Sequence, residues 1–291
     1  SLQTTKLELD YFETKTSEGS VSGKLSIVNF NIPVYEYVGK LKLDLKETLA
    51  LMKVDELTNP KGSVSASLNV SGTLTDVEKY GLDDWKRSKI DGELLINSLG
   101  FGFKSRPQTI SDLNGSLTFN NNSLDITKLI GKIDQTELVA KGKFNNLIAF
   151  LLDKDEPLFV DASVNSKHIH LGELLAANHS EKEADDDENY GLELSPRVTI
   201  YLSLLANELD FNKFKLNDLK GDVIVKNERI DARGISFTSQ EGKVNGDLFI
   251  REKDDKFVLI TKAQLEEVDI KKVFESFNNF GQEGIKAEHL E

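Results

Sequence analysis

The sequence has no cysteine and is poor in methionine, tryptophan and proline, with one, one and five residues respectively. The lack of cysteine excludes disulfide bonds and cysteine-based metal sites. It fits a reducing cytosol and, equally, a bacterial envelope protein that does without disulfides. No apolar stretch approaches the roughly 18 residues that a membrane-spanning helix needs, and no signal-peptide pattern is present. Because the sequence opens on Ser1 and ends within a repeat, we expect it to be a piece of a longer protein, and any membrane anchor would lie outside it.

Basic residues are also in short supply. Lys and Arg total 36 against 49 Asp and Glu, which gives a net charge of −13. This balance argues against nucleic acid or an anionic lipid surface as a broad electrostatic partner. It leaves the binding of apolar chains open. Hydrophobic residues make up 38% of the chain, which is low for a large compact core but sufficient for a sheet with one apolar face.

The sequence contains an internal repeat, one module present in two copies. Residues 110–119 match residues 216–225, and both copies open with Asp-Leu-x-Gly. The match runs without a gap to Leu129 and Ile235, Gly142 pairs with Gly246 if the second copy is slightly shorter, and a third copy begins near residue 285. Repeats of this kind bury a core by stacking on their neighbours. They therefore predict an extended β-structure and not a compact enzyme.

Apolar residues alternate with polar ones along most of the chain, strictly so over residues 41–45, and turn signals separate these runs. This pattern predicts an antiparallel meander of about fourteen strands. Short helices are expected at 83–87, 146–152, 171–177 and 270–280. The predicted fold class is mainly β: an elongated, repetitive antiparallel sheet curved into an open groove, or half-pipe, with a few short helices.

The repeats divide the chain into five segments. Residues 1–87 form an N-terminal β segment, either a divergent repeat or a cap. Residues 88–180 are the first repeat, 181–191 an acidic loop, 192–284 the second repeat and 285–291 the start of a truncated third. Gly115, Gly142, Gly221 and Gly246 recur at matching places, where they mark either periodic bending of the sheet or ordinary hairpin turns.

Two constellations could hold a metal ion. In the acidic loop Asp185, Asp187 and Asn189 alternate, but Glu193 comes too soon after them for a calcium loop, which favours a solvated segment. His168 and His170 also alternate and could chelate a metal. The second copy has Glu267 and Asp269 in their places, so an exposed polar face explains them more simply. We therefore expect no metal and no cofactor.

No catalytic motif stands out. The chain has no Gly-x-Ser-x-Gly elbow and no glycine-rich phosphate loop. A glycan-processing enzyme would need paired carboxylates with aromatic platforms, and Trp85 stands nearly alone. The sequence thus predicts a protein that is not an enzyme.

Several features together resemble a known family. They are the Asp-Leu-x-Gly strand, the Asn-centred hairpin at 120–122, the helix start Val-Asp-Ile-Lys-Lys-Val-Phe at 268–274 and the stretch from 273 to 290. Over about residues 88–290 the chain resembles the AsmA-like proteins, and most of all the C-terminal AsmA-like region of Bacteroidota. The resemblance implies a relative of TamB and of bridge-like lipid-transfer proteins. Such proteins are tethered to the inner membrane, extend into the periplasm, and conduct phospholipid acyl chains in an apolar half-pipe for outer-membrane assembly.

The resemblance and the alternation point to the same function. We expect a non-enzymatic periplasmic fragment that binds or conducts phospholipid acyl chains, with the inner and outer membranes as partners through parts outside this sequence, and no nucleic acid. The residues expected to line the groove are apolar and share one strand face: Leu117, Phe119, Leu124, Ile126, Val223, Val225, Ile230, Leu248 and Ile250. The alternative is a structural or interaction scaffold whose apolar face is self-packed and takes no lipid.

Overall fold

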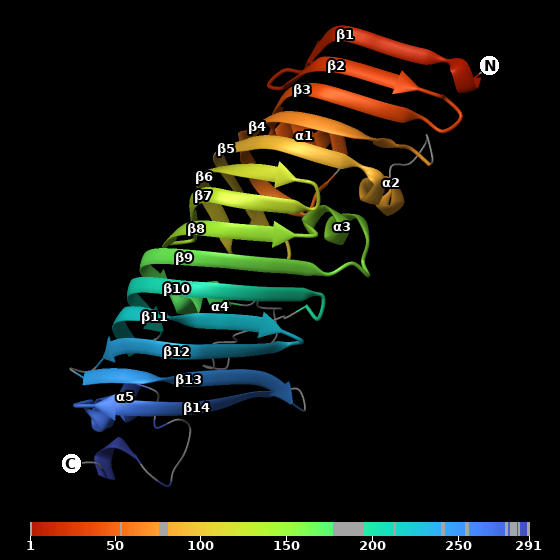
Figure 1. Cartoon of the computed structure of the whole chain (residues 1–291). Helices are drawn as coiled ribbons and strands as arrows, with labels where there is room; N and C mark the ends of the chain where they lie inside the picture. The colour runs from red at the N-terminus through yellow and green to blue at the C-terminus, as the bar shows by residue number, and fades with distance from the viewer. Residues whose placement is uncertain are drawn as a thin grey trace. The chain divides into compact units, whose positions relative to one another are not determined.

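The computed structural model shows one sheet of fourteen strands whose order in the sheet is their order in the chain (Figure 1). The pairings with a defined register are antiparallel, and β1 and β14 are the two edges. The predicted fold class, mainly β with an open antiparallel sheet and a few short helices, is confirmed. The structure describes residues 2–52, 54–75, 81–176, 195–211, 214–239, 242–253, 256–276, 279, 284 and 286–289.

The strands are 9 to 17 residues long. They are β1 (Lys6–Lys15), β2 (Ser20–Val28), β3 (Val34–Asp44), β4 (Leu57–Thr73), β5 (Lys89–Phe103), β6 (Thr109–Asn120), β7 (Ser123–Ile133), β8 (Thr136–Asn145), β9 (Leu158–His170), β10 (Val198–Phe211), β11 (Phe214–Lys226), β12 (Arg229–Ser239), β13 (Gly242–Lys253) and β14 (Lys256–Glu266). The helices are α1 (Leu45–Met52), α2 (Leu82–Arg87), α3 (Leu147–Leu152), α4 (Leu171–Leu175) and α5 (Ile270–Ser276), with short 3₁₀ turns at Leu2–Thr4 and Ala287–His289.

The chain forms two compact units, which are described separately. Unit 1 comprises Ser1–Lys104, Thr109–Gly131 and Lys141–Asp161; unit 2 comprises Ser105–Gln108, Lys132–Ala140 and Ala162–Glu291. Strands β7, β8 and β9 contribute residues to both. The five segments predicted from the repeats stay a prediction, and the acidic loop at 181–191 lies outside the described residues.

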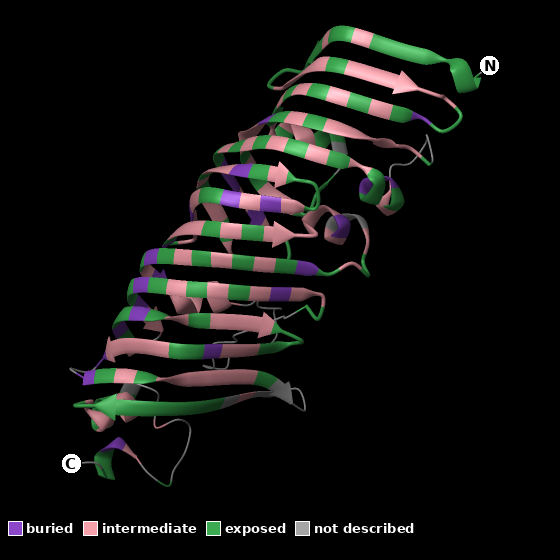
Figure 2. Ribbon diagram, viewed as in Figure 1, coloured by how far each residue is buried: buried purple, intermediate pink, exposed green. Residues whose placement is uncertain are grey.

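Because apolar and polar residues alternate along the strands, the sheet has one apolar face and one polar face, as expected. Exposed and half-buried residues alternate along β3 and β9, visible as bands in Figure 2. In unit 1 the antiparallel register then aligns one apolar residue from each strand, so that Val21, Leu41, Ala66, Leu94 and Leu117 form a continuous row across β2 to β6. Such cross-strand rows are what stabilises one face of a sheet.

The two copies of the module share their backbone geometry. Asp112 and Asp218, which open the two Asp-Leu-x-Gly motifs, both have positive φ, 52° and 55°. Asn121 and Asn227, at the following hairpin tips, both have φ 51°. Left-handed backbone is uncommon for residues other than glycine, although Asn and Asp tolerate it best. The repeat seen in the sequence is therefore a repeat of local structure as well.

The recurrent glycines lie inside strands, so the hairpin-turn interpretation was wrong. Gly115 lies within β6 and Gly221 within β11, and register shifts occur beside each. A Cβ at Gly115 would lie 2.8 Å from Leu129 Cδ1, and one at Gly221 would come closer still to Ile235 Cδ1. The matched pair Leu129 and Ile235 thus presses on the matched glycines. Within each unit the strands bend along their length beside such irregularities (Figure 1).

Four of the predicted helices are present as α2 to α5, and one helix was missed. The strict alternation over 41–45 predicted strand through Leu45, but the strand ends at Asp44 and Leu45 begins α1. The cause is a helix cap: Asp44 Oδ1 accepts the backbone N–H of Glu47 at 2.9 Å. The sequence Asp-x-x-Glu at 44–47 is a recognisable capping motif, but the prediction followed the strand-like alternation instead.

Helix α2 is fixed by a buried carboxylate. Asp84 accepts hydrogen bonds from the backbone N–H and the hydroxyl of Thr75, at 2.6 and 2.7 Å, and from the N–H of Gly81 at 3.0 Å. The side chain is 2% exposed. The backbone N–H groups of Thr75 and Gly81, with the Thr75 hydroxyl, hold the pKa of Asp84 below its usual value.

Because of this lowered pKa, Asp84 makes the stability of unit 1 depend on pH. A depressed folded-state pKa gives stability that is present above the ordinary Asp pKa and is lost as the pH falls through the lowered one. We expect Asp84→Asn to lower the Tm at neutral pH, and the difference in Tm from wild type to narrow as the pH falls below the ordinary Asp pKa of about 4. Thermal melts followed by circular dichroism measure the gap. The neighbouring exposed Asp83→Asn serves as control, and a gap independent of pH would contradict the assignment.

The close contacts at the repeated glycines give a second prediction. Gly115→Ala should cost about 1–3 kcal/mol, because the new Cβ would lie 2.5 Å from the backbone oxygen of Lys128, which cannot move aside. Gly221→Ala should cost less, because its nearest neighbour is the flexible end of Ile235. Removing that methyl with Ile235→Val should therefore partly rescue Gly221→Ala in urea unfolding.

Gly81→Ala is the matched control for these variants, since a Cβ at that position would have no heavy atom within 4 Å among the described residues. Strict additivity of Gly221→Ala and Ile235→Val would show that the two residues do not press on one another.

Candidate apolar binding face

In unit 2 five of the predicted groove residues lie side by side. Val225, Ile230 and Ile250 are register partners on β11, β12 and β13, and Val223 and Leu248 flank Ala232 one step along the same face. All five are half-buried. Leu202 and Ile200 of β10 extend the two rows. We call these two rows the C-terminal apolar face.

One end of this face is covered. A buried cluster of Ile169, Ala206, Leu209, Leu216 and Leu219 lies in unit 2, and Leu204 and Ile235 pack against it. Leu204 lies two residues after Leu202 on β10 and therefore on the same face of the sheet, so this cluster continues the C-terminal apolar face. Leu171 and Leu174 of α4 also pack on the cluster. The face is therefore closed by α4 at one end and half-buried beyond it.

The predicted groove residues of unit 1 are more deeply buried. Leu117, Leu124 and Ile126 are 6%, 7% and 5% exposed and form a core cluster, and Phe119 packs against it. Phe144 and Leu147, the first residue of α3, contact the same cluster. We call this the N-terminal apolar cluster. The structure thus brings the nine predicted residues together in two groups, one in each unit, with different burial.

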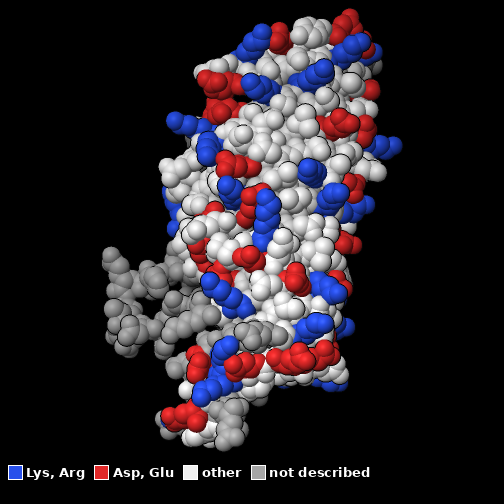
Figure 3. Space-filling model, turned by 90° about the vertical axis from the view of Figure 1, so that its left-hand side faces the viewer, with Lys and Arg blue, Asp and Glu red and all other residues white. Residues whose placement is uncertain are grey.

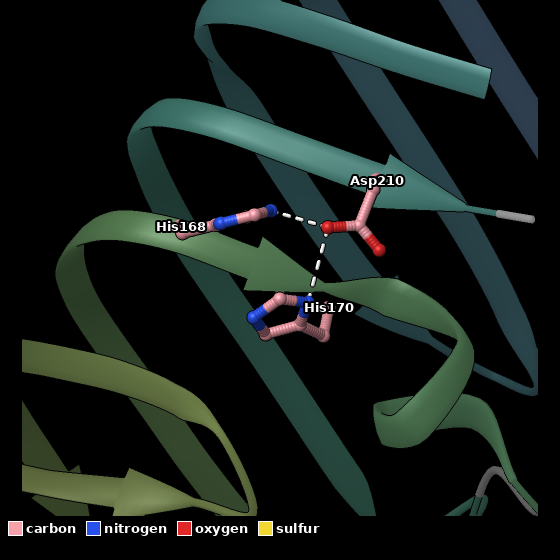
Figure 4. A group of neighbouring side chains, drawn as sticks. All are labelled: His168, His170 and Asp210. Atoms are coloured by element: carbon pink, nitrogen blue, oxygen red, sulfur yellow. Dashed lines mark hydrogen bonds and ion pairs between the residues drawn. The ribbon is translucent and has the colours of Figure 1, made fainter. Parts of the chain in front are cut away.

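The two alternating histidines have a third partner that the sequence did not reveal. The ring nitrogens of His168 and His170 both face Asp210 Oδ1 on β10 (Figure 4), the neighbour of β9 in the sheet. The distance from His170 Nδ1 to Asp210 Oδ1 is 3.0 Å. The signal available was a second alternating pair, Glu208 and Asp210, but only the strand register shows that the pairs meet.

No protein-family model, curated protein or solved structure matches the chain. The AsmA-like resemblance therefore has only the sequence motifs described above as its support. Among the described helices, none is long and apolar enough to cross a membrane.

The difference in burial between the two groups can be measured. We expect Ile126→Ala to destabilise the protein by about 2–5 kcal/mol, because it opens a cavity in a closed cluster. Ile230→Ala, on the half-buried face, should cost clearly less, because part of the deleted surface already contacts water. Urea unfolding of the two variants measures both costs. Equal costs would mean that the C-terminal apolar face is as dry as the N-terminal cluster.

Proposed function

We propose that this chain is a non-enzymatic lipid-binding module that takes up phospholipid acyl chains along the C-terminal apolar face. We further propose, from the AsmA-like resemblance, that it works in the periplasm within a longer, inner-membrane-tethered protein that serves outer-membrane assembly. The observation that carries the proposal is the pair of apolar rows at Val223–Leu248 and Val225–Ile250, aligned across three strands, in which every side chain except the buried Ala232 is half-buried.

Acyl chains suit this surface chemically. The rows offer branched aliphatic side chains without a charged group among the paired residues, so they favour a ligand by area and not by a specific polar contact. Each methylene transferred from water to such a face contributes about 0.8 kcal/mol. If an acyl chain buries a few methylenes on each strand that it crosses, the total is enough for reversible binding, which a surface that conducts lipid requires.

Charge does not oppose this proposal. On the face of the molecule drawn in Figure 3, acidic and basic side chains are interspersed with uncharged ones. Headgroups that stay in water are separated from most of these charges by screening, which acts over about 10 Å at moderate ionic strength. The net charge of −13 therefore weakens headgroup contacts more than it weakens the burial of acyl chains.

The N-terminal apolar cluster favours a second candidate function. With Leu117, Leu124 and Ile126 almost fully buried, unit 1 resembles a self-packed β-scaffold. If unit 2 closes in the same way in solution, the chain is a structural or interaction scaffold. The two candidates differ in whether the C-terminal apolar face takes up lipid.

The deciding experiment is native mass spectrometry with lipid extraction, on protein purified without detergent and then incubated with phospholipid vesicles. We expect near-stoichiometric phospholipid on the wild type. Ile230→Asp and Ile250→Asp should lose it, because each places a charge within the apolar rows.

Ile260→Asp is the matched control. Ile260 pairs with Phe249, so it lies on the opposite face from Ile250, and it is 45% exposed. Lipid retained by Ile260→Asp and lost by the other two supports the proposal. A lipid-free wild-type mass, unchanged after incubation with vesicles, supports the scaffold instead.

A further inference from the structure

Three potential metal ligands converge on one side of unit 2 (Figure 4). Each of His168, His170 and Asp210 offers one atom, and these atoms lie within 4.8 Å of one another. The centroids of the two imidazole rings lie 4.1 Å apart, and the ring planes are tilted by 34° to one another. One carboxylate oxygen of Asp210 faces a nitrogen of each ring, so the three candidate ligand atoms lie together.

The strand geometry explains this arrangement. Ile169 and Leu209 belong to the buried cluster of unit 2, so the residues on either side of them project from the opposite face. On that face β9 presents His168 and His170, and β10 presents Asp210. Their side chains are 40%, 25% and 27% exposed. The group is therefore sheltered but reachable by a small ion from solvent.

A comparison between the two module copies shows that His170 is not used as its counterpart is. Asp269 occupies the matching place, and it accepts the backbone N–H of Lys272 at 3.1 Å as the N-cap of α5. His170 occupies the N-cap position of α4 but makes no side-chain capping hydrogen bond. Its ring is directed to Asp210 instead. The matched residue therefore caps a helix in the second copy and contacts a carboxylate in the first.

The donor set suits a borderline-soft divalent ion. Two imidazole nitrogens with one carboxylate oxygen are ligands typical of Zn²⁺, at bond lengths near 2.0–2.2 Å. Tetrahedral bonds of that length place ligand atoms about 3.3 Å apart. The present separation of 3.0 Å between His170 Nδ1 and Asp210 Oδ1 is close to this value, whereas His168 Nε2 lies closer to the same oxygen, so the His168 ring must move away from Asp210 to admit the ion.

Neighbouring groups hold the ligands in place. Glu208 Oε2 lies 3.6 Å from His168 Nδ1, the ring nitrogen that does not face Asp210. The backbone N–H of His170 donates to the buried hydroxyl of Thr136 at 3.0 Å, and the backbone oxygen of His168 accepts from Ser166 at 3.0 Å. A carboxylate beside the far nitrogen of a ligating histidine orients the ring and raises its basicity.

From this geometry we infer that His168, His170 and Asp210 form a binding site for Zn²⁺ or a similar transition-metal ion. The ion links β9 to β10 where β9 meets α4, and its fourth position is open to water. Glu208 positions His168. The site is independent of the proposed lipid-binding role, since its ligands project from the face opposite Ile169 and Leu209. It departs from the sequence-based expectation of no metal, because Asp210 lies 40 residues from His170 in the chain.

Isothermal titration of the chelator-treated full chain with ZnCl₂ tests the inference. We expect one Zn²⁺ per chain, with a Tm that rises on addition of Zn²⁺ because the ion binds the folded state. His168→Ala, His170→Ala and Asp210→Ala should each weaken binding by at least about 100-fold, and Glu208→Gln by about tenfold.

His289→Ala is the control, since it removes a histidine from a separate turn. Circular dichroism of the metal-free variants establishes that each is folded. Co²⁺ provides a second measurement: its visible spectrum should report low-coordinate nitrogen and oxygen ligands in the wild type and revert to that of the hydrated ion in His168→Ala. Failure of the wild type to bind Zn²⁺, or equal binding by the His168→Ala/His170→Ala double variant, would overturn the inference.

Discussion

The register of the hydrogen-bonded ladder is the constraint on which the rest of the structure depends. Side chains alternate between faces with a period of two, so a slip of one residue in any pairing would move a whole strand's apolar set to the wrong face. Within unit 1 the register aligns Leu41, Ala66, Leu94 and Leu117 in one row. Within unit 2 it aligns Val225, Ile230 and Ile250. Both apolar surfaces, and the convergence of His168 and Asp210 on adjacent strands, exist because the pairing holds.

The glycines of the repeat help to fix that register. At Gly115 and Gly221 the missing side chain lets Leu129 and Ile235 lie against the neighbouring backbone, and the positive φ of Asp112 and Asp218 adds a bulge at the same distance before each. A slipped pairing would place a larger residue against Leu129 or Ile235 and lose this fit. Overpacking of that kind is destabilising, so the repeated motif favours one register over its neighbours.

Sequence reasoning reached the parts of this fold that local patterns determine. Alternation predicted the strands and their approximate number, and the repeat matched Asp112 with Asp218 and Asn121 with Asn227, pairs that share a left-handed backbone. It failed at Leu45, where a cap at Asp44 overrode the alternation, and at Asp210, whose meeting with the histidines depends on long-range register. The burial of the predicted groove residues also could not be predicted from the sequence, because it depends on where Leu147 of α3 and Leu174 of α4 pack.

The two copies of the module differ in how fully their apolar residues are buried. Phe119, Leu124 and Ile126 of the first copy correspond to Val225, Ile230 and Ala232 of the second. The apolar character is kept while two of the three side chains become smaller, and the larger set is the one that closes into a buried cluster. The smaller set leaves Val225 and Ile230 half-buried. Since cores are packed nearly as densely as organic crystals, a loss of side-chain volume must be made up by inward movement, by water or by a ligand. Neighbouring strands are held at a fixed spacing by hydrogen bonds, and in the second copy Ala232 is buried while Val225 and Ile230 keep part of their apolar surface exposed.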